Sequence, residues 1–153
     1  MKATTMSVFR VFFTAMMCFA ATAAHAGQIV STNDVRFIDG NNLVINGKAI
    51  ELYAIKVPEL GTFCDAEKRK YDCGKISRSS LMDMSAGAKI ICKQAPAPHS
   101  QNKYKCLSNG YDLSEGMVYT GWATPLETAP QLFKKLAREA KEKHRGMWRI
   151  SQN

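Results

Sequence analysis

The cysteine pattern constrains the fold of this chain more than any other feature. Cys18 lies in an apolar N-terminal run, so four of the five cysteines remain for a folded domain: Cys64, Cys73, Cys92 and Cys106. An even number in an exported chain favours disulfides. Of the three possible pairings, Cys64–Cys73 with Cys92–Cys106 is favoured because each pair closes a short loop around one structural element. A zinc site is the alternative, but neither pair has a tight CxxC spacing and no histidine has a ligand-like partner spacing.

The first 26 residues have the three parts of a secretory signal peptide. Lys2 and Arg10 supply positive charge, residues 11–23 form an apolar run, and Ala24-His25-Ala26 is a small-residue cleavage site. The run is too short to span a bilayer. A buried core helix is the alternative, which is disfavoured because the run has no polar face. We therefore expect cleavage before Gly27, no transmembrane segment in the mature chain, and a periplasmic or secreted protein.

Cleavage leaves residues 27–153, and these 127 residues are enough for one domain with one core. They contain 19 Lys and Arg against 13 Asp and Glu, a net charge of +6. A basic exported domain favours polyanionic partners such as nucleic acid, phosphorylated polysaccharide or an anionic membrane surface. A contribution to solubility alone is the alternative explanation of this charge.

Five segments have the character of β-strands. They are residues 28–38 with a turn at 31–34, then 43–45, 49–55, 88–93 and 103–108. Asn46-Gly47 is a strong two-residue hairpin signal, and Asn109-Gly110 closes the last strand. Pro58 stops the third segment because proline cannot donate a hydrogen bond to the ladder.

Three segments have the character of helices. The first covers residues 65–86, with an irregularity at Gly74 and a C-terminal cap at Gly87. Asp112 and Glu115 resemble a capping box that opens a short helix through Tyr119. Thr128 is the expected cap of the last helix, with Pro130 in its first turn. Gly146 ends that helix, and Trp148 is expected to pack back on the domain. The expected buried stripe of the last helix is Leu132, Phe133, Leu136, Ala137 and Ala140.

Periodicity alone predicts an α+β fold with antiparallel strands. Five strands with a helix in the middle and further helices at the C-terminus are the layout of an OB-fold barrel with added helices.

Short motifs, in their order and spacing, resemble those of the staphylococcal nuclease-like family over nearly all of residues 27–153. They are Ile38-Asp39-Gly40, Ile50-Glu51-Leu52, Val57-Pro58-Glu59-Leu60, Tyr71-Asp72-Cys73-Gly74, Ile91-Cys92, Lys105-Cys106, Gly110-Tyr111-Asp112-Leu113, Met117-Val118, Gly121-Trp122-Ala123 and Gly146-Met147-Trp148. Each motif alone is weak. The resemblance implies a five-stranded OB-fold barrel and, for the family, calcium-dependent hydrolysis of phosphodiester bonds in DNA or RNA.

The family's metal-binding positions are altered in this chain. The resemblance implies three carboxylates around a calcium ion, which needs several oxygen ligands. Asp39 remains, whereas Asn41 and Lys56 replace the other two carboxylates. The positive charge of Lys56 opposes metal binding, and an ion pair from Lys56 to Asp39 or Glu59 would be a structural substitute for the metal. Asp39-Gly40 is also a good turn without any metal.

The family's phosphate-binding positions are altered as well. Glu51 stands where the resemblance implies a first arginine, and a second arginine has no match. Lys103 or Lys105 could stand in for it only if their loop were re-routed. Glu59 remains at the general-base position, but a general base contributes at most about 10²–10⁴ to a rate. We therefore expect an inactive domain without a cofactor. Calcium is expected only under the alternative, a nuclease with residual or rearranged activity.

Basic residues recur along one face of the last expected helix. Lys134, Arg138, Lys141 and Arg145 stand at positions i, i+4, i+7 and i+11, and therefore form one stripe. The stripe is a candidate contact for nucleic acid or another polyanion. Because acidic and basic residues interleave with it, an ordinary solvated face is the alternative.

Overall fold

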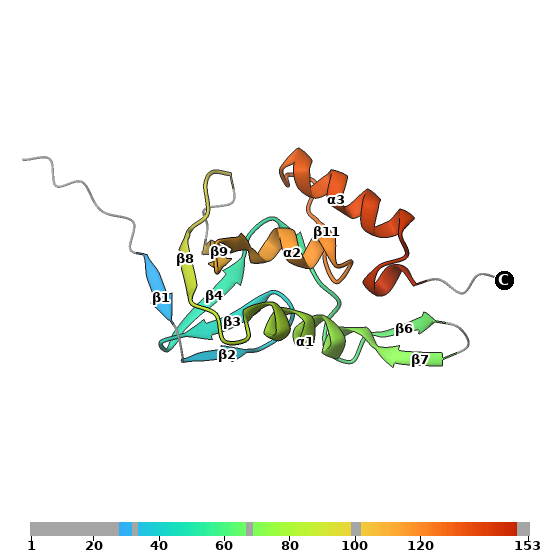
Figure 1. Cartoon of the computed structure of the whole chain (residues 1–153), viewed down its shortest axis with the longest axis horizontal. Helices are drawn as coiled ribbons and strands as arrows, with labels where there is room; N and C mark the ends of the chain where they lie inside the picture. Colours follow the sequence, from blue (N-terminus) through green and yellow to red (C-terminus); the bar gives the residue numbers. More distant parts are fainter. Residues whose placement is uncertain (1–27, 32–33, 67–68, 99–101, 150–153) are drawn as a thin grey trace, which may run out of the picture.

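The computed structural model describes residues 28–31, 34–66, 69–98 and 102–149 of the chain (Figure 1). The predicted signal peptide and the start of the mature chain at Gly27 lie outside these residues. The described part is an α+β fold made mainly of strands, with three α-helices and one short 3-10 helix. The strands are β1 (Ile29–Ser31), β2 (Val35–Phe37), β3 (Asn42–Ile45), β4 (Lys48–Leu52), β5 (Ile55–Lys56), β6 (Phe63–Ala66), β7 (Arg69–Asp72), β8 (Ile90–Gln94), β9 (Lys103–Ser108), β10 (Tyr111–Asp112) and β11 (Thr124–Pro125). The helices are α1 (Cys73–Ser85), α2 (Leu113–Tyr119), α3 (Gln131–Glu142) and η1 (Gly146–Trp148).

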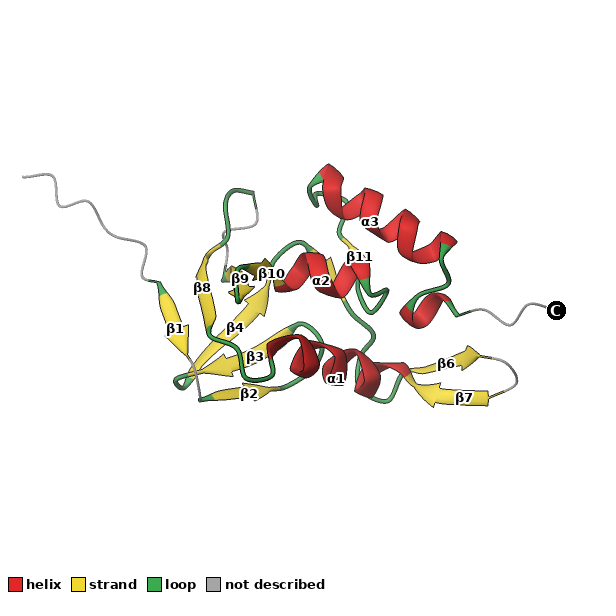
Figure 2. Ribbon diagram, viewed as in Figure 1, coloured by secondary structure: helices red, strands yellow, loops and turns green. Residues whose placement is uncertain are grey.

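The main sheet has the strand order β1-β8-β9-β4-β3-β2, and β10 pairs with β9 (Figure 2). Its pairs are antiparallel except β4 and β9, which run parallel. Two smaller pairs, β5 with β11 and β6 with β7, complete the strand pairing. Within the described residues this pairing is an open path from β1 to β2, so the five-stranded OB-fold barrel stays a prediction.

The core lies between the sheet and the helices. Alternate residues of β3 and β4 point inward, as the two-residue period of a strand requires, and Leu43, Ile45, Ile50 and Leu52 are buried there. Helix α2 packs between α1 and α3 (Figure 1). It contributes Leu113, Met117 and Val118 to the core, and Phe133 closes the core from α3.

Both predicted Asn-Gly turns are confirmed. Asn46 and Gly47 have φ angles of 51° and 76°, and Asn109 and Gly110 have 48° and 89°. Positive φ at both central residues is what a two-residue hairpin turn with a right-handed strand twist needs. The predicted strand at residues 103–108 is also confirmed, as β9.

Both predicted disulfides are confirmed, at Cys64–Cys73 and Cys92–Cys106. Cys92 and Cys106 stand opposite each other on β8 and β9 and are fully buried, so this bond ties two central strands through the core. These four cysteines are therefore not zinc ligands. Two disulfides in one small domain are typical of an oxidising, extracellular environment.

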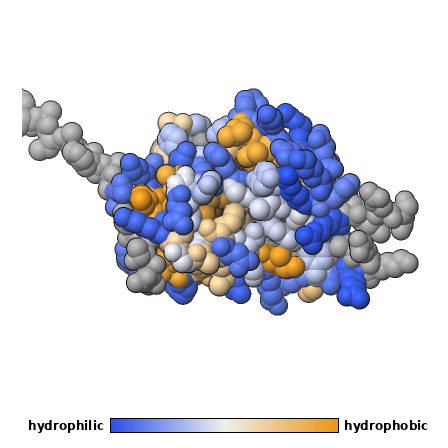
Figure 3. All heavy atoms as spheres, in the orientation of Figure 1, coloured by the Kyte–Doolittle hydropathy of each residue, from blue (hydrophilic) through white to orange (hydrophobic). Residues whose placement is uncertain are grey.

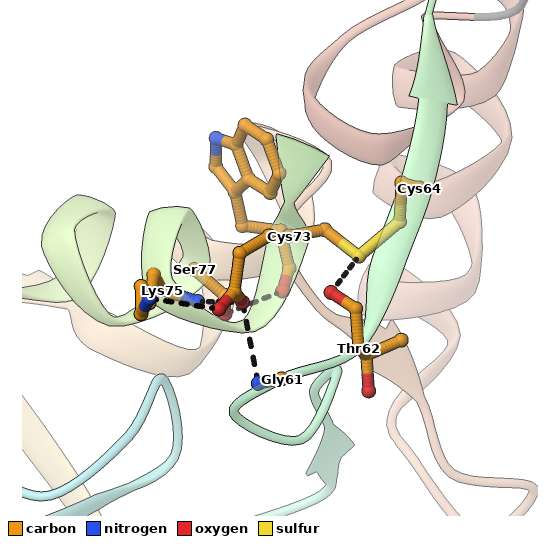
Figure 4. Close-up of a disulfide and its surroundings, with 8 residues drawn as sticks. Gly61, Thr62, Cys64, Cys73, Lys75 and Ser77 are labelled. Carbon is orange, nitrogen blue, oxygen red and sulfur yellow. Dashed lines mark hydrogen bonds and ion pairs between the residues drawn. A yellow bond between two sulfur atoms is a disulfide. The ribbon is translucent and has the colours of Figure 1, made fainter. Parts of the chain in front are cut away.

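The predicted helix at residues 65–86 is wrong in its first third. Residues 63–66 and 69–72 form the antiparallel pair β6 and β7, and α1 begins only at Cys73. Asp72 caps α1 by accepting a hydrogen bond from the Lys75 N–H at 2.9 Å. Figure 4 shows Lys75 and the Cys64–Cys73 disulfide at the start of this helix. The β6–β7 pair forms because this disulfide and strand pairing outweigh the helix propensity of the charged residues 65–70.

The last helix starts later than predicted. Helix α3 begins at Gln131 with Pro130 as its N-cap residue, so Thr128 is not the cap. Phe133 and Ala140 are buried as expected, but Leu132 is 48% exposed and does not belong to the buried stripe. The chain turns back after α3 through η1, where Trp148 lies half-buried.

None of the helices in the described residues is both long and apolar enough to cross a membrane.

Candidate functional site

The turn between β2 and β3 is organised by the carboxylate of Asp39. Its Oδ1 atom accepts hydrogen bonds from the backbone N–H groups of Asn41 and Asn42, both at 2.7 Å. The Asn42 side-chain amide donates to both oxygens, at 3.1 Å to Oδ1 and 2.9 Å to Oδ2. The carboxylate thus accepts four hydrogen bonds from its own turn, three on Oδ1 and one on Oδ2, which is the ordinary behaviour of an aspartate at this position.

Asn41 is held against the sheet and is only 7% exposed. Its backbone carbonyl accepts from Leu52 N–H at 2.9 Å, and its amide Nδ2 donates to Glu51 Oε1 at 3.4 Å. Its Oδ1 atom has no hydrogen-bond partner among the described residues. The preceding Gly40 packs against α1, because a Cβ there would lie 2.0 Å from the Ser77 hydroxyl oxygen. The turn is thus fixed by packing as well as by hydrogen bonds.

The negative charge of Glu51 is neutralised by Lys103. Glu51 on β4 and Lys103 on β9 are register partners in the parallel pair, and their side chains form an ion pair. Lys103 therefore reaches this region, but its charge is engaged by Glu51. Lys105 is engaged elsewhere, since its Nζ lies 3.4 Å from Asp112 Oδ2.

Lys56 and Glu59 are exposed residues at the end of β5 and in the loop that follows it. Lys56 is the last residue of β5, and its carbonyl accepts from the Thr124 hydroxyl at 3.3 Å. The Glu59 carbonyl accepts from Thr62 N–H at 3.0 Å and touches Gly74, where a Cβ would lie 2.0 Å from that oxygen. In the described residues Lys56 forms no ion pair with Asp39 or Glu59, so the suggested substitute for calcium is not found.

The cavity beside this turn is a shallow space of about 350 Å³ on the sheet. Asn42, Glu51, Asn102 and Tyr104 are among the residues that line it, and the Lys48 ammonium lies 5.2 Å from the centre of the Tyr104 ring. Among the described residues there is no group of three or more His, Cys, Asp and Glu side chains placed to hold a metal ion. The polar side chains beside this turn therefore form a cluster in which the charge of Glu51 is paired, and this cluster lies over an apolar strand surface.

Asp39 should matter for stability more than Glu59. We expect Asp39→Ala to lower the free energy of unfolding by about 1–3 kcal/mol, because two backbone N–H groups and the Asn42 amide lose their acceptor. Glu59→Ala removes an exposed side chain and should change stability by less than about 0.5 kcal/mol. Urea denaturation with and without calcium measures both. A calcium-dependent stabilisation of the wild type that Asp39→Ala abolishes would instead identify Asp39 as a metal ligand.

The basic stripe on α3 divides into a structural end and an exposed part. Arg145 donates from Nη1 to the Tyr119 carbonyl at 3.2 Å, and its guanidinium stacks 4.0 Å above the Tyr119 ring. Its Nη2 atom also lies 3.2 Å from Glu139 Oε1. By contrast, Arg138 and Lys141 are exposed and Lys134 is half-exposed. The surface over α3 is mainly hydrophilic in the view of Figure 3.

Glu139 forms ion pairs with two basic residues near the C-terminal end of this stripe. It pairs with Lys143 at 2.9 Å and with Arg145 at 3.2 Å. The hydrogen bond that Lys143 donates, together with both positive charges, lowers the pKa of Glu139. Lys134, Arg138 and Lys141 form none of the ion pairs found in the described part of the chain. Lys135 is exposed as well, and the Lys141 ammonium lies 5.6 Å from the centre of the Trp148 ring. Lys134, Arg138 and Lys141 are therefore the cationic groups of the stripe that a partner can reach without breaking an ion pair.

A buried polar cluster around Asp112 was not predicted. Asp112 caps α2 as expected, accepting from Ser114 N–H at 2.9 Å and Glu115 N–H at 3.4 Å. Its other oxygen accepts from the Tyr53 hydroxyl at 2.9 Å across the core. Burial, followed by the charge of Asp112, raises the pKa of Tyr53 far above its usual value. Burial also raises the pKa of Glu115, and Asp112 adds to that effect.

No protein-family model matches this sequence, and no curated protein sequence matches it. The resemblance to the staphylococcal nuclease-like family is therefore not supported by an independent match and stays a prediction.

Proposed function

We propose that this chain is an exported, non-catalytic binding module of the staphylococcal nuclease-like family that holds an anionic partner on α3. The observation that carries this proposal is the distribution of charge. Residues 131–149 contain seven Lys and Arg against two Asp and Glu, whereas residues 27–130 contain 12 against 11. The net positive charge of the mature chain is thus concentrated on one helix and the turn after it.

The exposed positions on α3 support a contact surface. Lys134, Arg138 and Lys141 are spaced by four and three residues, so they lie on one side of the helix. A stripe of like charge on a surface attracts a polyanion and speeds its association, and the effect falls as salt rises. Nucleic acid and acidic polymers of other kinds both fit this chemistry.

The residues at the family's catalytic positions support an inactive domain. The Asp39 carboxylate accepts hydrogen bonds from the backbone of its own turn, and Glu51 forms an ion pair with Lys103. Lys56 contributes a positive charge where the family pattern has a metal-binding carboxylate. A phosphodiester-cleaving site needs positive groups on the phosphate and a metal or an equivalent charge to stabilise the transition state. In this chain a carboxylate, Glu51, stands at the first phosphate-binding position.

The remaining features are consistent with the proposal. The strand-first order with a central helix and C-terminal helices supports an OB-type barrel architecture. The two disulfides support a periplasmic or secreted location. The alternative function is a nuclease with a rearranged site, and the exposed carboxylate of Glu59 is the observation that favours it. Calcium would be a cofactor only under that alternative.

The proposal is tested by charge reversal on α3. A triple variant with Lys134→Glu, Arg138→Glu and Lys141→Glu should bind fluorescein-labelled deca-glutamate and a 15-nucleotide oligo(dT) at least about tenfold more weakly at low salt. Arg145 is left intact because it supports the fold through Tyr119 and Glu139. Fluorescence anisotropy over a series of salt concentrations gives the affinities.

The matched control carries the same change of net charge elsewhere. Arg36→Glu, Lys89→Glu and Lys93→Glu reverse three exposed basic residues on β2, β8 and the preceding loop. This control variant should retain affinity to within about threefold. Equal losses in both triple variants, or no binding of either ligand by the wild type, would rule out a specific site on α3.

A further inference from the structure

A second surface adjoins the basic helix and has a different character. It is a groove of about 320 Å³ between α1, α2 and the β9–β10 turn. Its walls are mainly apolar or aromatic side chains: Met84, Tyr111, Leu113 and Tyr119, with Gly116 among them. Tyr111 is 80% exposed and Tyr119 is 45% exposed. Two large aromatic side chains left open beside one apolar groove are typical of a recognition site.

Three of the polar side chains that line this groove already form hydrogen bonds within the protein. The Ser108 hydroxyl donates to the Met84 carbonyl at 2.9 Å, and the Thr120 hydroxyl donates to the Gly116 carbonyl at 2.9 Å. The Asp112 carboxylate accepts from Tyr53 and from the start of α2. A nucleobase buried here would lose hydrogen bonds to water that these three groups do not replace, whereas an apolar side chain would lose none.

The composition of the groove favours a protein ligand. Tyr, Met and Arg are enriched at protein–protein interfaces, because they supply large contact areas. Here two tyrosines and Met84 line the groove, and Arg145 stacks on Tyr119 at its edge. The groove therefore matches the pocket that accepts one anchor side chain of a bound peptide.

The position of Arg145 connects the groove to the basic stripe. Arg145 follows α3 in the chain and lies over Tyr119 of α2, so the C-terminal end of α3 adjoins the groove. Lys134 and Lys141 are seven positions apart on α3, about 10 Å of helix. An extended chain covers that distance with about three residues. A peptide with an anchor in the groove can thus place its next few residues along α3.

We propose that the groove takes one apolar side chain of a protein partner, and that acidic residues next to this anchor lie on α3. This inference rests on the proposed function, since it identifies the anionic partner as an acidic protein segment. Nucleic acid, the other class of polyanion, is a separate outcome of the test below.

The test uses fluorescein-labelled nine-residue peptides with four acidic residues on each side of a central position. The central residue is Phe, Leu, Trp or Met in four probes and Ala in the fifth. At least one apolar probe should bind about tenfold more tightly than the Ala probe. Tyr111→Ser should remove this difference without changing the affinity of the Ala probe, and Tyr111→Phe should keep it. Tyr111 is 80% exposed, so neither substitution should disturb folding.

Three results would overturn the inference, and they are distinguishable from one another. If all five probes bind equally and the α3 charge-reversal variant weakens all of them, the helix binds polyanions but the groove holds no anchor. If Tyr111→Ser weakens oligo(dT) and leaves the peptides unchanged, the tyrosine stacks on bases, and the partner is nucleic acid. If no probe binds, including deca-glutamate and oligo(dT), the proposed function fails together with the inference.

Discussion

Replacing Gly121 with alanine should lower the free energy of unfolding by about 2–5 kcal/mol. Gly121 has a φ angle of +78°, a region that costs a residue with a Cβ about 1–2 kcal/mol. The added Cβ would also lie 2.4 Å from the Arg145 carbonyl oxygen. That neighbour is backbone and cannot swing aside, so relieving the overlap adds about 1–3 kcal/mol.

This glycine is important because it joins two parts of the fold. Gly121 follows α2, and Gly146 faces it from the turn after α3, with a φ of +54° and room for no Cβ either. The Met147 N–H donates to the Gly121 carbonyl at 3.1 Å. The contact holds the end of α3 against the end of α2 and places Arg145 over Tyr119. Its loss should therefore affect both stability and the surface proposed for binding.

Gly110→Ala is the matched control for this prediction. Gly110 has a φ angle of +89°, but nothing lies within 4 Å of the position of its Cβ. The control should therefore show the backbone cost alone, about 1–2 kcal/mol. Urea denaturation of both variants measures the difference. Equal losses for Gly121→Ala and Gly110→Ala would show that the contact with Arg145 relaxes without cost.

The features predicted best from sequence are those set by neighbouring residues. Asn46-Gly47 and Asn109-Gly110 form turns because each pair tolerates positive φ. Asp112 caps α2 because its side chain reaches the N–H groups of the next few residues. The disulfide pairing followed from short loops in the same way. These interactions need no knowledge of the rest of the chain.

The features missed depend on residues distant in sequence. Glu51 and Lys103 are 52 residues apart, and Tyr53 and Asp112 are 59 apart. Neither pair can be inferred from spacing, because the parallel pairing of β4 with β9 and the packing of α2 create them. The pairing of β6 with β7 was missed for a different reason, because both strands are close in sequence. Residues 65–70 have helix propensity, and only a partner strand and the nearby disulfide override it.

The second large effect we expect is the absence of nuclease activity. The three residues at the family's metal positions carry about zero net charge, because Asp39 and Lys56 are opposite and Asn41 is neutral. A calcium site needs several negative oxygen ligands, and here the carboxylate of Asp39 already accepts bonds from Asn41 and Asn42. Since an electrostatic clamp is worth factors of about 10²–10³ per group, a lone Glu59 cannot replace these losses.

Single substitutions should not restore activity either, because the deficit is distributed. Lys56→Asp would return one carboxylate but leave Asn41 and Glu51 unchanged. Glu51→Arg would place a cation beside Lys103, its present ion-pair partner, and would therefore introduce repulsion rather than a phosphate clamp.

The most direct test of this account is a cleavage assay with the purified protein. Single-stranded DNA and RNA are incubated with the wild type and with Glu59→Ala, over a series of calcium concentrations and with a chelator. If the domain is inactive, the wild type should cleave neither substrate faster than Glu59→Ala at any calcium concentration. Robust cleavage that requires calcium and disappears in Glu59→Ala would contradict it and identify the chain as a working nuclease.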